Sequence, residues 1–385
     1  MQNGPTVWDK RFVLLNVIFF LVFSNISFFY LYPVALKSIG AQDYAIGIVI
    51  GVFSAVSVVT RPFMGKAVGR KGEFPIILLG IVGILIASIT YLFEKRLTIF
   101  VFLTRALHGC GFSAFIAGSF SLVAKTFPPT KRAQAYGIVG VSLMSASALC
   151  PPLGEMVINS FGLASLYLCA GLAALGAFFL VVLNQKNISL PASDSRKSNM
   201  NYPALLNDRS FLYVLTSTLI FAHCQSTVLN FLALLASLKG KSSGFFFAVA
   251  FSMAIFLLLT LSTKIDELGK KRFLRFFYPL LFAGLFLIPT SLEKNLLFVP
   301  AALFGSAMGV LFPVHNALAA EHGSRAEKPG VMSLFTATYD TGFITGPVIS
   351  GWVAQWAGLQ HLFHLTAVLS ALGLFIALLA PIKGK

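Results

Sequence analysis

The chain of 385 residues is 57% hydrophobic and 11% charged, and it carries a formal net charge of +16. A soluble protein of this length needs far more polar side chains to cover its surface, so the composition excludes a soluble globular protein. A positive excess is also found in nucleic-acid-binding proteins. Here the basic residues lie in short clusters between apolar segments, which argues against that class.

Apolar segments of about 20 residues recur along the whole chain, each long enough to cross a hydrocarbon layer ~30 Å thick. Backbone groups in lipid must pair with one another, so these segments are predicted to be helices. The twelve predicted spans are 12–36, 44–66, 74–93, 97–124, 133–160, 163–184, 211–238, 243–264, 273–292, 295–320, 329–356 and 359–381. We therefore expect an all-α membrane protein with twelve transmembrane helices.

The distribution of basic residues predicts the orientation in the membrane. With both termini in the cytoplasm and twelve crossings, 21 of the 29 Lys and Arg residues fall on the inner side and 6 on the outer side. Arg61 and Arg105 fall inside or at the ends of predicted helices. An asymmetry of this size follows the positive-inside rule, so both termini are expected to be cytoplasmic.

A polar stretch after the sixth predicted span divides the chain. Its Ser, Lys, Arg and Asn residues are typical of a flexible cytoplasmic linker. We therefore predict an N-terminal six-helix bundle over residues 1–184, a linker over 185–209 and a C-terminal six-helix bundle over 210–385.

A charged signature occurs twice, 197 residues apart, each time after a long apolar segment. Both copies are incomplete forms of G-x-x-x-D-R-x-G-[KR]-[KR]. The first copy keeps Arg70 and has lost the Asp, whereas the second keeps Asp266 and has lost the Arg. The residues expected to act in a gating loop are Gly65, Arg70 and Gly72 in the first copy and Asp266, Gly269 and Lys270 in the second.

A second repeat occurs inside two predicted spans. The segment from Cys150 to Glu155 parallels the segment from Gly346 to Gly351, at an offset of 196. Proline bends a helix and glycine permits close helix contact, so both spans are expected to be bent. The expected bend residues are Pro151, Pro152, Gly154, Gly346 and Pro347. Two repeats at nearly the same offset predict two pseudo-symmetric halves, an arrangement found in transporters.

These motifs resemble the major facilitator superfamily over essentially the whole chain. The stretch from Arg105 to Ala114 is similar to the R-x-x-Q-G-x-G-x-x-A pattern of its drug:proton antiporter branch, with His108 in place of Gln. The fifth span resembles the branch's G-P-x-x-G-G motif, with Cys150 and Glu155 in place of glycines. The resemblance implies two bundles around a central cavity, alternating access, proton coupling and the inner membrane of a bacterium.

Ionisable side chains inside the membrane are costly and point to function. Glu155 and Asp340 are the two of the thirteen acids that lie well inside predicted spans. Asp340 is a candidate for proton coupling or substrate binding, or else a hydrogen-bond partner that locks two helices together. Glu155 lies near the outer end of its span, where it could respond to external protons, meet a cationic substrate or simply be solvated.

Arg105 is the strongest single candidate for proton coupling, because a buried guanidinium needs a partner and keeps its proton. The resemblance implies that it biases the protonation of a nearby acid. The alternative is a structural arginine that satisfies helix carbonyls. His108 is a candidate member of the same relay, since imidazoles titrate in the relevant pH range.

Further polar side chains in the predicted spans are candidates for a substrate cavity. In the resembling fold, the seventh and tenth helices face the cavity. Each histidine among these residues could instead be a satisfied core residue. The candidates are Asn16 and Asn25 in the first span, His223 and Gln225 in the seventh, and His315 and Asn316 in the tenth.

We predict a proton-coupled secondary transporter that exports a small organic solute, such as a drug, a metabolite or a siderophore. The alternative is a proton symporter that imports a nutrient or chelate, and a sensor or scaffold is more remote. No nucleophile–base pair, nucleotide loop or metal-ligand spacing is visible in the sequence, so no enzyme activity, metal or cofactor is expected. The expected partners are the small-molecule substrate, protons and the lipid bilayer, without nucleic acid, and the chain is expected to act as a monomer.

Overall fold

The structure is a computed structural model that describes residues 9–185, 207–261, 264–323 and 327–379. These residues form helices joined by short connections, with no strand among them. The linker predicted over 185–209 lies almost wholly outside the described residues. The chain divides into two compact units, residues 1–40 with 52–196 (unit 1) and residues 41–51 with 197–385 (unit 2). The bundle boundaries drawn from the sequence stay predictions.

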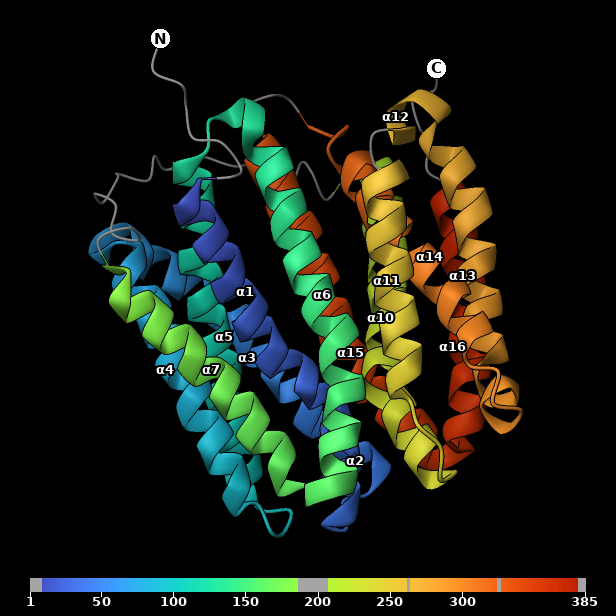
Figure 1. Cartoon of the computed structure of the whole chain (residues 1–385). Coiled ribbons are helices and arrows are strands. Elements are labelled where there is room, and N and C mark those ends of the chain that lie inside the picture. The colour runs from blue at the N-terminus through green and yellow to red at the C-terminus, as the bar shows by residue number, and fades with distance from the viewer. Residues whose placement is uncertain (1–8, 186–206, 262–263, 324–326, 380–385) are drawn as a thin grey trace. The chain divides into compact units, whose positions relative to one another are not determined.

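Long helices make up both units, and their ribbons can be followed in Figure 1. Unit 1 contains α1 (Lys10–Phe28), η1 (Phe29–Leu31), α2 (Tyr32–Ser38), most of α3 (Asp43–Lys71), α4 (Glu73–Thr90), η2 (Tyr91–Phe93), α5 (Ile99–Thr126), α6 (Pro129–Phe161) and α7 (Ala164–Leu183). Unit 2 contains α10 (Arg209–Leu238), α11 (Gly244–Leu261), α12 (Ile265–Leu268), α13 (Lys270–Glu293), α14 (Phe298–Ala319), α15 (Lys328–Ala357) and α16 (Leu359–Leu379).

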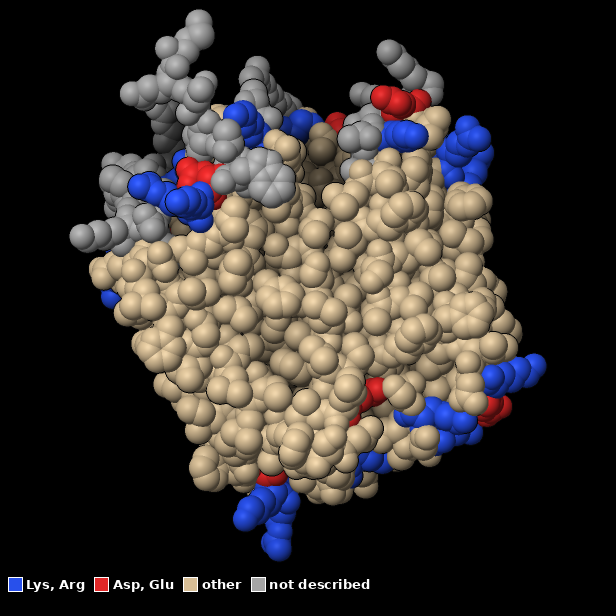
Figure 2. Space-filling model, viewed as in Figure 1, with Lys and Arg blue, Asp and Glu red and all other residues tan. Residues whose placement is uncertain are grey.

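Among the described residues, eleven helical segments are long and apolar enough to cross a membrane. The predicted eleventh span, α15, is 30 residues long but is too polar to be counted with them. Its middle carries Thr336, Thr338, Asp340 and Thr341, which lower its mean hydropathy. On the face shown in Figure 2, the charged side chains of each unit gather at its two ends. The protein is an all-α membrane protein, as the hydropathy pattern predicts.

The same helix pairs pack together in both units. In unit 1, α1 packs on α6 and α7, and α4 packs on α5 and α7. In unit 2, the corresponding helices repeat these pairs: α10 packs on α15 and α16, and α13 packs on α14 and α16. When the spans are numbered along the chain, unit 1 has the pairs 1–5, 1–6, 3–4 and 3–6. Unit 2 has the pairs 7–11, 7–12, 9–10 and 9–12, in which every number is higher by six. The two six-helix bundles are therefore pseudo-symmetric, which confirms the duplication inferred from the sequence repeats.

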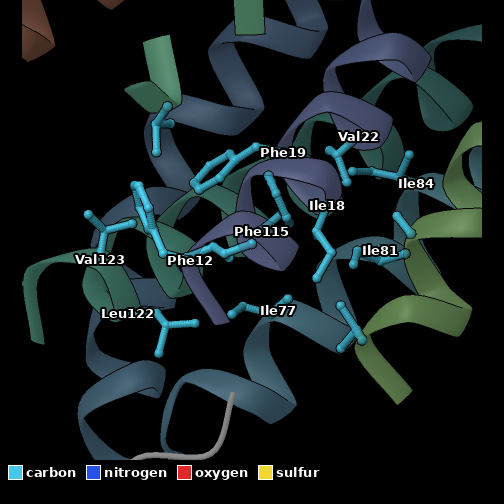
Figure 3. Close-up of a cluster of buried hydrophobic side chains, with 14 of the residues drawn as sticks. Phe12, Ile18, Phe19, Val22, Ile77, Ile81, Ile84, Phe115, Leu122 and Val123 are labelled. Atoms are coloured by element: carbon cyan, nitrogen blue, oxygen red, sulfur yellow. The ribbon is translucent and has the colours of Figure 1, made fainter. Parts of the chain in front are cut away.

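Aromatic and branched side chains fill the centre of unit 1 (Figure 3). Phe12 meets Phe127 edge-on with ring centroids 4.7 Å apart, and Phe19 meets Phe115 in the same way at 5.3 Å. Because lipid tails are as apolar as these side chains, close van der Waals packing holds such helices together rather than exclusion of water. The helices around the polar residues of unit 1 are thus fixed by a tightly interlocked core.

Glycines let α4 and α5 approach each other closely. A Cβ atom added at Gly80 would overlap the backbone of Phe115, and one at Gly111 would lie 2.8 Å from the carbonyl oxygen of Gly80. Backbone atoms cannot move aside as the end of a flexible side chain can. The contact between α4 and α5 therefore requires glycine at these positions.

We expect Gly80→Ala to destabilise the protein by about 1–3 kcal/mol, because the new methyl group forces the two backbones apart. The thermal unfolding temperature in detergent measures this effect. Gly137→Ala in α6 is the matched control, since a Cβ there meets no atom within 4 Å. Equal unfolding temperatures for the two variants would show that the α4–α5 contact is not tight.

The first copy of the charged signature is helical rather than a loop. Helix α3 continues to Lys71, so Gly65 and Arg70 lie on its last turns. Basic residues at this end favour the extra turns, because they face the negative end of the helix dipole. Gly72, with a φ of 85°, separates α3 from α4, and Gly269, with a φ of 88°, separates α12 from α13. The two copies thus share a glycine in the left-handed region before the next helix.

The predicted bend residues lie inside long helices. Pro151 and Pro152 lie within α6, and Pro347 lies within α15. Gly154 faces Leu31 and Phe28 of the first span.

The start of α3 belongs to unit 2, where Tyr44 stacks on Trp352 of α15 with ring centroids 5.0 Å apart.

Candidate functional site

A buried cluster of polar and aromatic side chains surrounds Arg105 in unit 1. Arg105 lies six residues after the start of α5, or about 9 Å along the helix axis. The short connection from η2 to α5 brings Tyr91 and Glu94 to the same end of the unit. The side chain of Arg105 is buried, with 4% of its surface exposed.

The guanidinium of Arg105 lies among aromatic rings. Its central carbon is 4.8 Å from the ring centroid of Phe53, 5.0 Å from that of Tyr32 and 5.4 Å from that of Phe29. Its Nη1 donates a hydrogen bond of 3.2 Å to the hydroxyl of Tyr91. Each cation–π contact contributes roughly 0.5–2 kcal/mol, depending on desolvation. Three aromatic rings and the hydroxyl of Tyr91 therefore stabilise the buried charge of Arg105. Within the described residues, Arg105 forms no ion pair.

Hydrogen bonds from His108 continue this cluster in one direction. Asn25 Nδ2 donates to Ser88 Oγ at 2.8 Å and to a backbone carbonyl, so its Oδ1 is an acceptor. His108 Nε2 therefore donates to that oxygen at 3.0 Å, and Nδ1 accepts from the Tyr91 hydroxyl at 3.1 Å. A second proton on His108 would leave the Tyr91 hydroxyl without its acceptor. The arrangement favours a neutral His108 that positions Tyr91.

Glu94 is the acid of this cluster, and it was not among the candidates predicted from the sequence. It follows the span that ends at Phe93. The hydroxyl of Tyr32 donates to Glu94 Oε2 at 2.7 Å. Burial raises the pKa of Glu94 to about 7, although the Tyr32 hydrogen bond and the charge of Arg105 act in the opposite direction. The carboxyl group therefore titrates near neutral pH.

Of the other candidates in unit 1, Asn25 is linked to the Arg105 cluster through His108, whereas Asn16 and Glu155 lie apart from it. Asn25 is fully buried between α1, α4, α5 and α7. Asn16 accepts a hydrogen bond of 2.9 Å from Ser142 of α6, which ties α1 to α6. Glu155 is half-buried on α6. Of the candidates predicted in this unit, the structure brings together Arg105, His108 and Asn25.

Unit 2 contains a second buried polar cluster, around His315. Nδ1 of His315 donates to the carbonyl of Leu311 at 2.7 Å, so Nε2 is an acceptor. The hydroxyls of Ser217 and Tyr278 lie 3.0 Å and 3.1 Å from Nε2. Ser217 also donates to the carbonyl of Gly373 at 3.0 Å. The cluster joins α10, α13, α14 and α16, and His315 is a fully buried core residue. Asn316 beside it is half-buried.

The remaining candidates of unit 2 lie along the contact between α10 and α15. Tyr339 donates to Gln225 Oε1 at 2.7 Å, and His223 Nδ1 lies 3.4 Å from the hydroxyl of Thr345. Gly346 packs directly on Ser226. Asp340, next to Tyr339, is half-buried in the middle of α15. Polar side chains therefore line this helix pair, and the substrate role of these residues stays a prediction.

A third polar site lies at the opposite end of unit 1 from Arg105. Glu73, the first residue of α4, is fully buried. Its Oε1 lies 2.7 Å from Lys125 Nζ of α5 and accepts a hydrogen bond of 2.8 Å from Ser121. Neither Glu73 nor Lys125 was among the candidates predicted from the sequence. Glu73 directly follows the first charged signature, so this end of unit 1 has an acid–base pair despite the missing Asp of the motif.

The other gating-loop candidates differ in exposure: Gly72 is buried and Gly269 is exposed. Arg70 and Gly65 are exposed on the last turns of α3. Lys270 forms an ion pair of 2.8 Å with Glu321. Asp266 lies in α12, and its side chain is outside the described part of the structure. Their gating role stays a prediction.

Comparisons with known proteins agree with this architecture. Residues 12–293 and 265–384 match the model of the Major Facilitator Superfamily. Two Escherichia coli proteins named multidrug resistance protein MdtG are 24% and 23% identical over 384 residues, which cover 95% of this chain and 93% of each relative. Among solved structures, that of the nucleoside transporter NupG has a TM-score of 0.80 at 14% identity, covering 97% of this chain and all of that chain. A bacterial homologue of the human lysosomal transporter Spinster, in an inward-facing conformation, has a TM-score of 0.74 at 13% identity, covering 98% and 97%.

The duplicated six-helix bundles with buried charged and polar clusters define a multi-pass membrane transporter. The chain belongs to the Major Facilitator Superfamily. This confirms the family inferred from the repeated signature and from the motif that begins at Arg105. A small-molecule substrate and a membrane location follow from the family.

Proposed function

We propose that this transporter exports small organic solutes from a bacterial cell across the inner membrane in exchange for protons, with both termini in the cytoplasm. The observation that carries the proposal is the buried Arg105 on α5, which contacts three aromatic rings and Tyr91 and acts electrostatically on Glu94. A permanent positive charge beside a titratable carboxyl group can couple proton binding to a change of side-chain contacts.

The relatives support the direction and the kind of solute. The proteins named multidrug resistance protein match over nearly the whole chain, and their name points to drug-like solutes. The sequence also resembles the drug:proton antiporter branch at Arg105 and its neighbours. Exchange is the natural coupling for export, because protons that flow into the cell then drive the solute out.

The test uses purified protein in liposomes and ethidium, a small organic cation whose charge does not change with pH. With an acidic lumen, an antiporter accumulates ethidium inside as protons leave. With an alkaline lumen, a symporter accumulates it as protons enter. We expect accumulation with the acidic lumen and none above protein-free liposomes with the alkaline lumen. Accumulation with the alkaline lumen would instead support the alternative of a symporter.

A further inference from the structure

We propose that Glu94 is the carboxyl group that binds and releases the coupled proton, and that Tyr32 and Arg105 are the positioning residues that set its charge. This inference rests on the proposed function and names the acid that the proposed function requires. The proton adds to a carboxylate oxygen of Glu94 from the end of unit 1 where α4 leads into α5. It leaves from the same oxygen, so no other reactant is needed.

The hydrogen bonds of Glu94 suit a group that changes its charge. Oε2 accepts one hydrogen bond, of 2.7 Å, from Tyr32. Oε1 is buried and has no hydrogen-bond partner within the described residues. A carboxylate held by a single hydrogen bond is poorly stabilised in a buried place, whereas the neutral acid loses little there. Burial therefore penalises the charged form and raises the pKa of Glu94 to about 7.

The groups that face Glu94 come from four elements, and one of them carries a charge. Tyr32 comes from α2, Tyr91 from η2, Arg105 from α5 and Tyr167 from α7. The three tyrosines are neutral, and Tyr32 alone among them donates to Glu94, so the guanidinium of Arg105 is the charge that favours the carboxylate. Lys95 and Arg96, next in the chain, are exposed and therefore screened by solvent.

Tyr32 connects the acid to the arginine. Its hydroxyl donates to Glu94, and the guanidinium of Arg105 lies over its ring at 5.0 Å. Arg105 Nε is itself buried without a hydrogen-bond partner in the described part of the chain. When Glu94 loses its proton, attraction between the two charges draws Arg105 toward the acid. When Glu94 gains a proton, the rings and Tyr91 alone hold Arg105. The charge of Glu94 thereby selects between two positions of a buried side chain.

Two other acids with clear contacts fit the role less well. Glu73 already forms an ion pair with Lys125 at 2.7 Å. Glu293 is the last residue of α13, but its side chain is 54% exposed and pairs with Lys239. Glu94 combines a buried carboxylate oxygen, a single hydrogen bond to its carboxyl group and a nearby unneutralised cation. Glu293 is accordingly the matched control.

The test compares wild type, Glu94→Gln and Glu293→Gln in liposomes. Glutamine has the size of glutamate and still accepts the hydrogen bond from Tyr32, so equal unfolding temperatures check that the fold is kept. The infrared absorption of protonated carboxyl groups is recorded as a function of pH. We expect a band that titrates at about pH 7 in wild type and in Glu293→Gln, and its loss in Glu94→Gln. A band that persists in Glu94→Gln would overturn the proposal.

Transport gives a second readout. Proton-driven ethidium accumulation is expected to fall by at least about tenfold in Glu94→Gln. A tenfold ratio of dye is what a gradient of about one pH unit can drive when one proton is exchanged for one dye molecule. The residual transport should no longer change between pH 6 and pH 8, whereas Glu293→Gln should keep the wild-type profile. If wild type shows no proton-driven accumulation, the proposed function fails. If wild type accumulates the dye and Glu94→Gln has the same pH profile, the role of Glu94 alone fails.

Discussion

Replacing Arg105 with alanine is expected to reduce proton-driven solute transport by about a hundredfold, and replacing it with lysine by about tenfold. The guanidinium contacts the flat faces of Phe53, Tyr32 and Phe29 and donates to Tyr91 at the same time. Lysine keeps the charge near Glu94 but lacks the planar group that stacks on several rings. Alanine removes the charge as well.

The initial rate of ethidium accumulation in liposomes with an acidic lumen measures both variants. Arg96→Ala is the matched control, because Arg96 lies at the same end of unit 1 but is exposed. It should transport like wild type. Equal rates for the alanine and lysine variants would show that the geometry of the guanidinium has no role. Wild-type rates in both variants would remove Arg105 from the mechanism altogether.

Lys125→Met is expected to lower the free energy of unfolding by about 3–5 kcal/mol, because it leaves the charge of Glu73 buried without its cation. Glu73 is fully buried, its Oε1 lies 2.7 Å from Lys125 Nζ, and Ser121 supplies a single neutral hydrogen bond. Methionine keeps most of the length and the apolar stem of lysine. The loss therefore reports the charge and not the packing.

Unfolding in detergent measures this effect in three variants. The double variant Glu73→Gln with Lys125→Met should regain most of the stability, since it removes both charges. Lys239→Met breaks the exposed pair with Glu293 and should cost less than about 1 kcal/mol. If Lys125→Met costs no more than Lys239→Met, the pair at the start of α4 does not stabilise unit 1.

Hydropathy and repeats were enough to predict the architecture. Apolar runs of sufficient length must be helical in lipid, so the spans followed directly from composition along the chain. The end of α3 was misjudged by five residues, because Lys66, Arg70 and Lys71 break the apolar run without breaking the helix. Helix α15 shows the opposite effect. Its polar middle reduces its hydropathy, yet the repeat at Gly346 identified it as the counterpart of α6.

The candidate site was only partly predictable, because hydrogen-bond partners depend on how helices face one another. Arg105 and His108 were identified from the motif on α5. Their partners Tyr91 and Asn25 come from other helices, and no spacing in the sequence links them. Glu94 was not among the predicted candidates, because it lies between two predicted spans and not inside one. One signal in the sequence could have pointed to Glu94. It is an acid that lies shortly before Arg105 in the chain, and Arg105 was already predicted to be buried.

The histidines illustrate the same limit in unit 2. His315 was predicted as a candidate cavity residue, because the tenth helix faces the cavity in the resembling fold, with a satisfied core histidine as the alternative. The structure places it among Ser217, Tyr278 and a backbone carbonyl, where its hydrogen-bonding groups are satisfied. The residues that complete this cluster are an ordinary serine and tyrosine, which carry no signal in an apolar sequence.

The movement of protons against the dye tests the central claim most directly. Liposomes that contain the purified protein and a trapped pH indicator are prepared with equal pH inside and outside, and ethidium is then added outside. A proton-coupled antiporter should make the lumen more alkaline as the dye enters, and Arg105→Ala should abolish this change. Entry of the dye with an unchanged or more acidic lumen would contradict proton-coupled exchange.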